Sequence, residues 1–173
     1  QYQKIKPEID KAISEVINST AFINGPAVKE FQVALEKYLG VKHVIPCANG
    51  TDALQISMMA LGLKPGDEVI APDFTFIATA EVIALLGLTP VLVDVEPDTF
   101  NISPEAIKKA ITPRTRAIVP VHLFGQAAEM DAIMQIAAEH NLFVIEDACQ
   151  SIGADYLNKD NVWKKTGAIG HVG

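Results

Sequence analysis

The stretch Leu-Phe-Val-Ile-Glu-Asp-Ala-Cys-Gln, residues 142–150, decides the fold class. Its apolar first half is typical of a buried strand, and the run ends abruptly in the carboxylates of Glu146 and Asp147. In an open parallel sheet the carboxyl ends of the strands border the ligand crevice, so an acid there is either a ligand group or a helix cap. Side chains alternate along a strand, so Glu146 points away from Asp147 and we interpret Glu146 as structural.

Apolar runs of strand length recur before this stretch, and each is followed by a helical pattern. The runs cover residues 41–46, 68–71, 90–95, 116–121 and 142–145. This alternation predicts βαβ units, and hence an α/β fold in three layers, α/β/α, with a mostly parallel sheet covered by helices on both faces.

Two segments lie outside the repeating units. Residues 7–19 carry an apolar stripe and predict an amphipathic helix, and Asn24-Gly25-Pro26 then breaks the chain. We therefore expect an N-terminal helical segment over 1–26 and a large domain over 27–173. After Gln150 the sequence becomes polar and predicts a hairpin with its turn at 158–161. The chain begins at Gln1 and stops just after a Gly-rich segment, so we expect a fragment with an incomplete large domain.

Composition excludes several classes of function. With 49% hydrophobic and 20% charged residues, the chain can bury a core. A net charge of −7 without a basic run longer than Lys164-Lys165 argues against nucleic acid as a partner. No apolar run reaches the roughly 18 residues of a membrane span, and no signal pattern is present, so we expect a cytoplasmic protein without membrane partners. Cys47 and Cys149 lack metal-ligand spacing, so we expect free thiols and no metal site.

The loop after the first apolar run, residues 47–54, opens a helix. Gly50 lets the backbone approach a ligand closely, Thr51 offers a hydroxyl, and the free N–H groups at a helix start favour an anion such as phosphate. The alternative is an ordinary helix cap after a glycine turn.

Two further loops should reach the same edge of the sheet. Phe74 and Phe76 follow the second run, and one of them could stack on an aromatic ligand, while the alternative for each is core packing. His122 ends the fourth run and is either a hydrogen-bonded structural residue or a direct participant.

A phosphate cradle, an aromatic plate and a carboxylate at one edge match the needs of pyridoxal phosphate. The ring nitrogen of this cofactor must stay protonated if the ring is to withdraw electrons, and a carboxylate such as that of Asp147 achieves this. Gln150 could donate an amide hydrogen to the ring oxygen.

Many collinear motifs resemble the DegT/DnrJ/EryC1/StrS family of sugar aminotransferases, which have the aspartate aminotransferase fold. They are Gly-Thr-Asp-Ala-Leu at 50–54, residues 63–72, Phe-Thr-Phe at 74–76, residues 111–118, Pro-Val-His at 120–122 and Glu-Asp-Ala-Cys-Gln at 146–150. Together they cover nearly the whole chain. The resemblance implies that the cofactor is held by Gly50, Thr51 and Asp52 at the phosphate, Phe76 on the ring, Asp147 at the ring nitrogen and Gln150 at the ring hydroxyl.

The sequence departs from the family pattern at a few positions. Cys149 stands where alanine is usual, and Ala168 stands where an acid is usual. The resemblance places the Schiff-base lysine just past Gly173. Lys159, Lys164 and Lys165 belong to the polar hairpin, and we interpret them as solvated charges.

The resemblance implies an aminotransferase that moves an amino group from a donor amino acid, glutamate, to a keto group of a nucleotide-linked sugar for polysaccharide biosynthesis. It also implies a homodimer with a shared active site. Two alternatives remain open. One is a sugar dehydratase of the same family, in which histidine replaces the lysine, and the other is a regulatory protein that binds the cofactor without turnover.

Overall fold

The computed structural model describes all residues from Gln1 to Gly173. Contacts within the chain divide it into two compact units, Gln1–Pro46 and Cys47–Gly173. This division groups the second helix with the first. The boundary expected after residue 26 stays a prediction about the complete protein.

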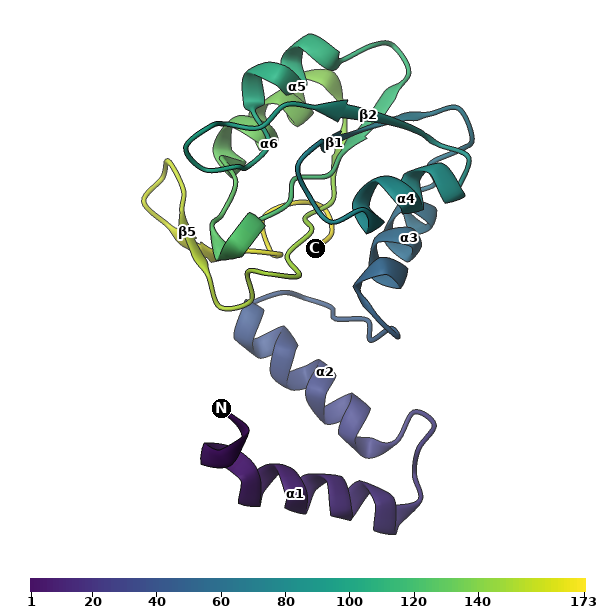
Figure 1. Ribbon diagram of the computed structural model, residues 1–173, viewed down its shortest axis with the longest axis vertical. Coiled ribbons are helices and arrows are strands. Elements are labelled where there is room, and N and C mark those ends of the chain that lie inside the picture. The colour runs from purple at the N-terminus through teal and green to yellow at the C-terminus, as the bar shows by residue number, and fades with distance from the viewer. The chain divides into compact units, whose positions relative to one another are not determined.

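The first unit contains α1 (Tyr2–Ser19) and α2 (Pro26–Leu39), joined by a loop (Figure 1). The helix α1 begins before its predicted start at Pro7, which therefore lies inside the helix and cannot donate a backbone hydrogen bond. The helix α2 begins with Pro26, where a missing N–H is tolerated, and ends at Gly40 in the left-handed conformation. Neither helix buries a side chain within this chain.

Residues 41–46 form no strand, so the strand predicted there is wrong. Ile45 is 81% exposed, and none of the strand pairings includes this segment. An apolar run becomes a strand only when a neighbouring strand supplies hydrogen bonds to its backbone.

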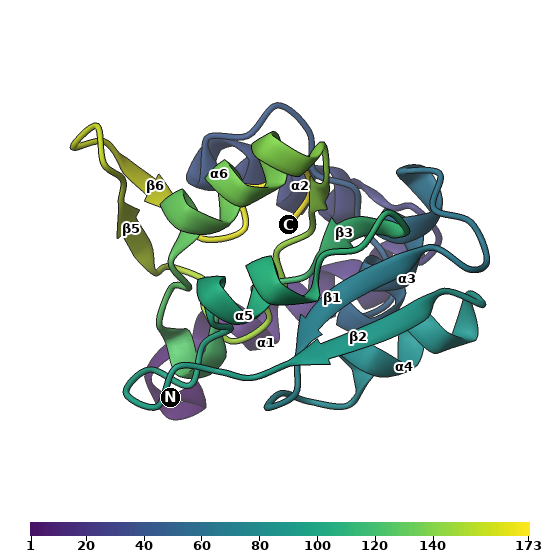
Figure 2. The ribbon, with the colours of Figure 1, turned by 90° about the horizontal axis from the view of Figure 1, so that it is seen from above.

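The second unit is built on a four-stranded parallel sheet, β1 (Glu68–Pro72), β2 (Thr89–Val93), β3 (Thr115–Ile118) and β4 (Phe143–Val144). Its strand order is β2-β1-β3-β4, and Figure 2 shows β2, β1 and β3 side by side. Single parallel bridges extend the pairing, from Val121 to Asp147 and from Ile145 to Val172.

Helices cover both faces of the sheet, as the sequence predicts. In Figure 1, α3 (Gly50–Ala60) and α4 (Ala78–Leu85) lie together on one side, and α5 (Pro104–Ala110) and α6 (Met130–His140) on the other. Successive strand residues alternate between the two cores: Val69 packs with α3 and α4, and Ile70 packs with α5 and α6. The three-layer α/β fold is therefore confirmed.

The predicted hairpin after Gln150 is also present, as β5 (Asp155–Leu157) and β6 (Trp163–Lys165). The Asn158 carboxamide oxygen accepts hydrogen bonds from the backbone of Asp160 and Val162 and so closes the turn. None of the helices is long and apolar enough to cross a membrane. No group of three or more His, Cys, Asp or Glu side chains is placed to hold a metal ion.

Candidate functional site

A cavity of about 270 Å³ lies at the carboxyl edge of the sheet in the second unit. Every predicted cofactor-contacting residue except Asp52 lines it, although these residues come from three separate loops. The full lining is Gly50, Thr51, Leu54, Thr75, Phe76, Ala78, Val121, Asp147, Cys149 and Gln150.

The N-terminus of α3 supplies the polar end of this cavity. Asn49 caps the helix in an extended conformation, and its side-chain oxygen accepts from the Asp52 N–H at 2.9 Å. The Asn49 amide also donates to the Asp52 carboxylate at 3.0 Å, which keeps that side chain at the cap and out of the cavity lining. The N–H groups of Gly50 and Thr51 and the Thr51 hydroxyl have no partner within the chain, so they are free to bind an anion.

Gly50 packs closely against Cys149 and also lines the cavity. A Cβ at this position would lie 2.7 Å from the Sγ atom of Cys149, far inside normal contact distance. Burial and the neighbouring Asp147 carboxylate raise the pKa of the Cys149 thiol to about 11. Cys149 is therefore neutral near pH 7 and adds no negative charge beside Asp147.

Asp147 is held in register with the sheet. Its backbone N–H donates to the Pro120 carbonyl at 2.9 Å, and its own carbonyl accepts from the His122 N–H at 3.0 Å. The side chain is only 9% exposed, and it does not cap a helix. Its Oδ2 atom accepts from the Thr79 hydroxyl at 3.0 Å, and its Oδ1 atom accepts from the Cys149 N–H at 3.3 Å.

The Gln150 carboxamide has a defined orientation. Its Oε1 atom accepts from the Phe124 N–H at 2.8 Å, so the other end of the amide, a donor, remains for a ligand. Phe124 belongs to the short 3-10 turn Leu123–Gly125 and adopts a left-handed φ of 55°, which is uncommon for a bulky residue.

The aromatic residues of the second loop divide between two roles. Phe76 is 70% exposed and lines the cavity, so it is not a core residue of this chain. Phe74 instead lies against Phe100, with 5.5 Å between the ring centroids.

Thr75 is a cavity residue that the sequence reasoning missed. Its hydroxyl oxygen is buried and has no hydrogen-bond partner. Leaving a buried hydroxyl unpaired costs roughly 1–3 kcal/mol, so a bound polar group is the expected compensation. The sequence signal that could have identified Thr75 is its position between Phe74 and Phe76 in the loop 72–79. The unpaired Thr75 hydroxyl, the open N–H groups of α3 and the Asp147 carboxylate together fit a ligand that has a phosphate, a flat ring and a ring nitrogen.

His122 lies outside the cavity and is fully buried. Its Nδ1 atom accepts from the Ala128 N–H at 3.0 Å, so the ring proton is on Nε2, which donates to Glu146 at 2.8 Å. The structure therefore supports the structural alternative for His122.

Glu146, which lies just after β4, accepts hydrogen bonds from several segments. Besides His122, its carboxylate accepts from the backbone N–H groups of Gly167, Ile169 and Gly170. Burial opposes its ionisation, but these hydrogen bonds outweigh burial and hold the pKa of Glu146 below its ordinary value.

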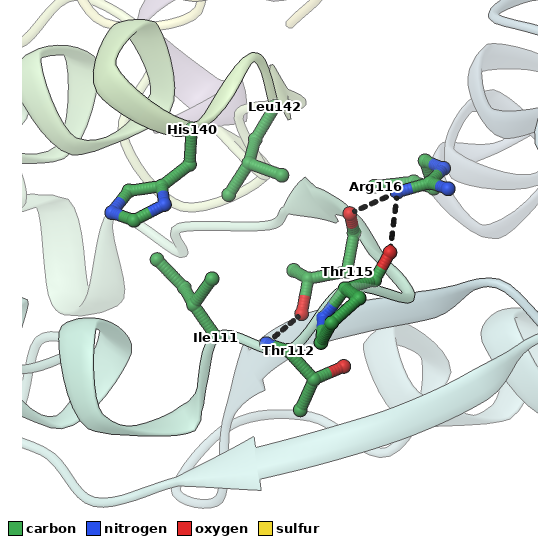
Figure 3. A pocket seen from close by; sticks show the side chains of 7 residues that line it. Ile111, Thr112, Thr115, Arg116, His140 and Leu142 are labelled. Atoms are coloured by element: carbon green, nitrogen blue, oxygen red, sulfur yellow. Dashed lines mark hydrogen bonds between the residues drawn. The ribbon is translucent and has the colours of Figure 1, made fainter.

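A second cavity, of about 390 Å³, lies at the opposite, amino edge of the strands (Figure 3). Its polar groups bond to one another: Arg116 donates to the Pro113 and Thr115 carbonyls at 3.0 and 2.9 Å, and the Thr112 N–H donates to the Thr115 hydroxyl. None of the predicted site residues lines it. The cavity at the amino edge is therefore the larger one, but it offers fewer groups that could bind a ligand than the cavity at the carboxyl edge.

The hairpin lysines lie away from the cavity at the carboxyl edge. Lys165 pairs with Asp155 at 2.8 Å, the Lys159 N–H donates to Asp131, and Lys164 is exposed. None of these lysines lines the cavity, which agrees with their interpretation as surface charges.

Comparison with known proteins gives consistent matches. The sequence profile of the DegT/DnrJ/EryC1/StrS aminotransferase family matches residues 3–173. The UDP-2-acetamido-2-deoxy-3-oxo-D-glucuronate aminotransferase of Pseudomonas aeruginosa is 54% identical over 159 residues, a match that covers 92% of this chain and 44% of the relative.

Two solved structures extend the comparison. A DegT DnrJ EryC1 StrS aminotransferase from Brucella abortus is 48% identical with a TM-score of 0.93, over 99% of this chain and 46% of that one. A GDP-4-keto-6-deoxymannose-3-dehydratase, solved with a trapped PLP-glutamate geminal diamine, is 32% identical with a TM-score of 0.84, over 92% and 42%. The chain spans less than half the length of each of these proteins. It belongs to the DegT/DnrJ/EryC1/StrS aminotransferase family.

Proposed function

We propose that the complete protein is a pyridoxal-phosphate-dependent aminotransferase that transfers an amino group from glutamate to a keto group of a nucleotide-linked sugar. The observation that carries this proposal is the convergence of Gly50, Thr51, Phe76, Asp147 and Gln150 on one cavity. Relatives named as sugar aminotransferases support the reaction class.

Each residue has a distinct task in this proposal. The N–H groups of Gly50 and Thr51 and the Thr51 hydroxyl bind the phosphate, and Phe76 lies on the ring. Asp147 keeps a proton on the ring nitrogen. Gln150 donates its amide hydrogen to the ring oxygen. Asp52 contributes through the cap of α3, because its carboxylate and N–H are bonded to Asn49.

Pyridoxal phosphate, when bound, supplies a conjugated ring that withdraws electrons from the carbon undergoing proton transfer. Because the Cys149 thiol is neutral, Asp147 supplies the negative charge of the cavity lining. We place the Schiff-base lysine after Gly173, on the grounds of the family resemblance. The parallel bridge from Ile145 to Val172 supports this placement, because the chain there runs toward the edge that holds Asp147.

We further propose a cytoplasmic homodimer, with substrate and cofactor crevice at the subunit interface. Several apolar side chains that belong to the cavity lining or to nearby sequence positions are strongly exposed, among them Phe76, Ile77, Phe124 and Ile152. A partner subunit would cover them. Two free cysteines are consistent with a reducing compartment.

A sugar dehydratase is the second candidate, and the 32% identical dehydratase structure favours keeping it. The residue at the Schiff-base lysine position, which we place past Gly173, distinguishes the aminotransferase from the dehydratase. A histidine at that position would support dehydration. The products differ as well, because transamination replaces the keto oxygen of the sugar with an amino group, whereas dehydration removes a hydroxyl group and a hydrogen as water.

The experiment incubates the full-length protein with pyridoxal phosphate, glutamate and nucleotide-linked keto sugars, and measures 2-oxoglutarate and the sugar product by mass spectrometry. We expect an amino sugar and an equal amount of 2-oxoglutarate. The Asp147→Ala variant should lose about 100-fold or more in turnover, because the ring nitrogen loses its charged partner. Asp155→Ala, which removes an exposed carboxylate from the hairpin, is the matched control and should keep normal turnover. Unreacted glutamate, or normal turnover by Asp147→Ala, would contradict the proposal.

A further inference from the structure

Thr79 makes a contact with Asp147 that links two distant parts of the chain. It lies in the first turn of α4 and is 0% exposed, and its hydroxyl donates to Asp147 Oδ2 at 3.0 Å across 68 positions of sequence. Thr79 does not line the cavity, although its neighbour Ala78 does. The side chain therefore stands behind the carboxylate, out of reach of a ligand.

The carboxylate of Asp147 needs such a contact if it is to keep one orientation. The last torsion of an aspartate side chain is soft and broadly populated, so the carboxylate plane can rotate. The other bond to this carboxylate comes from the N–H of Cys149, at 3.3 Å and from the same loop. Thr79 supplies the shorter bond and the only side-chain bond from another element.

We infer that Thr79 is a positioning residue, which aims the Asp147 carboxylate at the ring nitrogen of the cofactor. This inference rests on the proposed function. A hydroxyl has a single proton to donate, and Thr79 gives it to Asp147 rather than to its own helix. The helix α4 packs against β1 and β2, so it provides a rigid support for that donor.

A purely structural role is the competing explanation. In that case the bond would satisfy a buried carboxylate and stabilise the fold, with no particular effect on the ring nitrogen. The two explanations differ in what they predict for a cofactor analogue in which carbon replaces the ring nitrogen. Only a positioning role makes the effect of Thr79 depend on that nitrogen.

The experiment measures the affinity of full-length apoprotein for pyridoxal phosphate and for its 1-deaza analogue. We compare the wild type with Thr79→Val, which removes the donor at similar volume, and Thr79→Ser, which restores it. Thr79→Val should weaken binding of pyridoxal phosphate about 10-fold, and Thr79→Ser should bind like the wild type. The wild type and Thr79→Val should bind the deaza analogue equally.

Thr166→Val is the matched control, because Thr166 is a buried threonine whose hydroxyl donates to the Ser151 carbonyl outside the cavity. It should lower the melting temperature without changing the ratio of the two affinities. If the valine variant fails to fold, Thr79→Ala removes the same donor and replaces it in the comparison with Thr79→Ser.

Two results would overturn the inference while leaving the proposed function intact. They are unchanged affinity of Thr79→Val for pyridoxal phosphate, and an equal loss of affinity for the natural cofactor and the analogue. A wild-type protein that binds neither compound would overturn the proposed function, and the inference with it.

Discussion

The carboxylates of Glu146 and Asp147 are neighbours in sequence but point to opposite sides of the chain that continues β4. Asp147 lines the cavity, and Glu146 is buried with His122 and the 167–170 loop. The sequence predicts this separation, because side chains alternate along a strand. It could not reveal Thr75 or Thr79, because a hydroxyl left unpaired, or paired with a residue 68 positions away, depends on the folded arrangement.

The Thr75 hydroxyl should contact the bound cofactor. Thr75→Val should weaken binding of pyridoxal phosphate to the full-length protein by about 10-fold, since the bound ligand then loses the Thr75 hydroxyl as a hydrogen-bond partner. Titration followed by the absorbance of the cofactor measures this affinity. Thr99→Val, at a threonine outside the cavity, should bind normally. A Thr75→Val protein with wild-type affinity would remove Thr75 from the site.

Glu146 should contribute stability that depends on pH. Glu146→Gln is expected to lower the free energy of unfolding by about 1–3 kcal/mol, because it removes the buried carboxylate that accepts from His122 Nε2 and leaves N–H groups facing an amide. Glu105→Gln, in an exposed pair with Lys108, is the control and should change stability by no more than about 0.5 kcal/mol.

The sign of the pH effect follows from the lowered pKa of Glu146. The ionised carboxylate stabilises the folded state fully at any pH above the ordinary pKa of a glutamate side chain, which applies in the unfolded state. That stabilisation is lost as the pH falls through the lower folded-state pKa. Urea unfolding at several pH values should show the difference between wild type and Glu146→Gln shrinking in this acidic range. A constant difference would contradict the role assigned to Glu146.

At the scale of elements, helices and strands with a local signal were predictable. Ser103 caps α5 ahead of Pro104, a pair of residues typical of a helix start. The four strands of the parallel sheet arise from predicted apolar runs. The run at 41–46 shows the limit. Its composition is that of a strand, yet strand formation depends on a partner, which no local pattern can supply.

The cap of α3 links element stability to the proposed phosphate site. Asn49→Ala should destabilise the protein by about 1 kcal/mol, because the Asp52 N–H loses its acceptor. It should also weaken cofactor binding, since the first turn of the helix becomes less ordered. Thermal unfolding and cofactor titration measure the two effects. Asn141→Ala, at the C-terminus of α6, is the comparison and should leave cofactor affinity unchanged. If Asn49→Ala and Asn141→Ala bind the cofactor with equal affinity, the cap of α3 does not contribute to phosphate binding.

At the scale of the whole molecule, the unburied apolar surface points to a partner subunit. The stripe of α1 includes Ile9, Ile13 and Ile17, and none of these residues is buried within this chain. We predict that the full-length protein is a homodimer burying more than about 2,000 Å². Sedimentation at micromolar concentration should give the dimer mass. A fully active monomer would contradict the shared site.

The central claim is that the cavity at the carboxyl edge holds pyridoxal phosphate, and a crystal structure of the full-length protein with the cofactor tests it most directly. We predict the phosphate at the N–H groups of Gly50 and Thr51, the ring on Phe76, and the ring nitrogen at Asp147. A cofactor bound elsewhere, for example in the cavity lined by Arg116 and His140, would contradict the account.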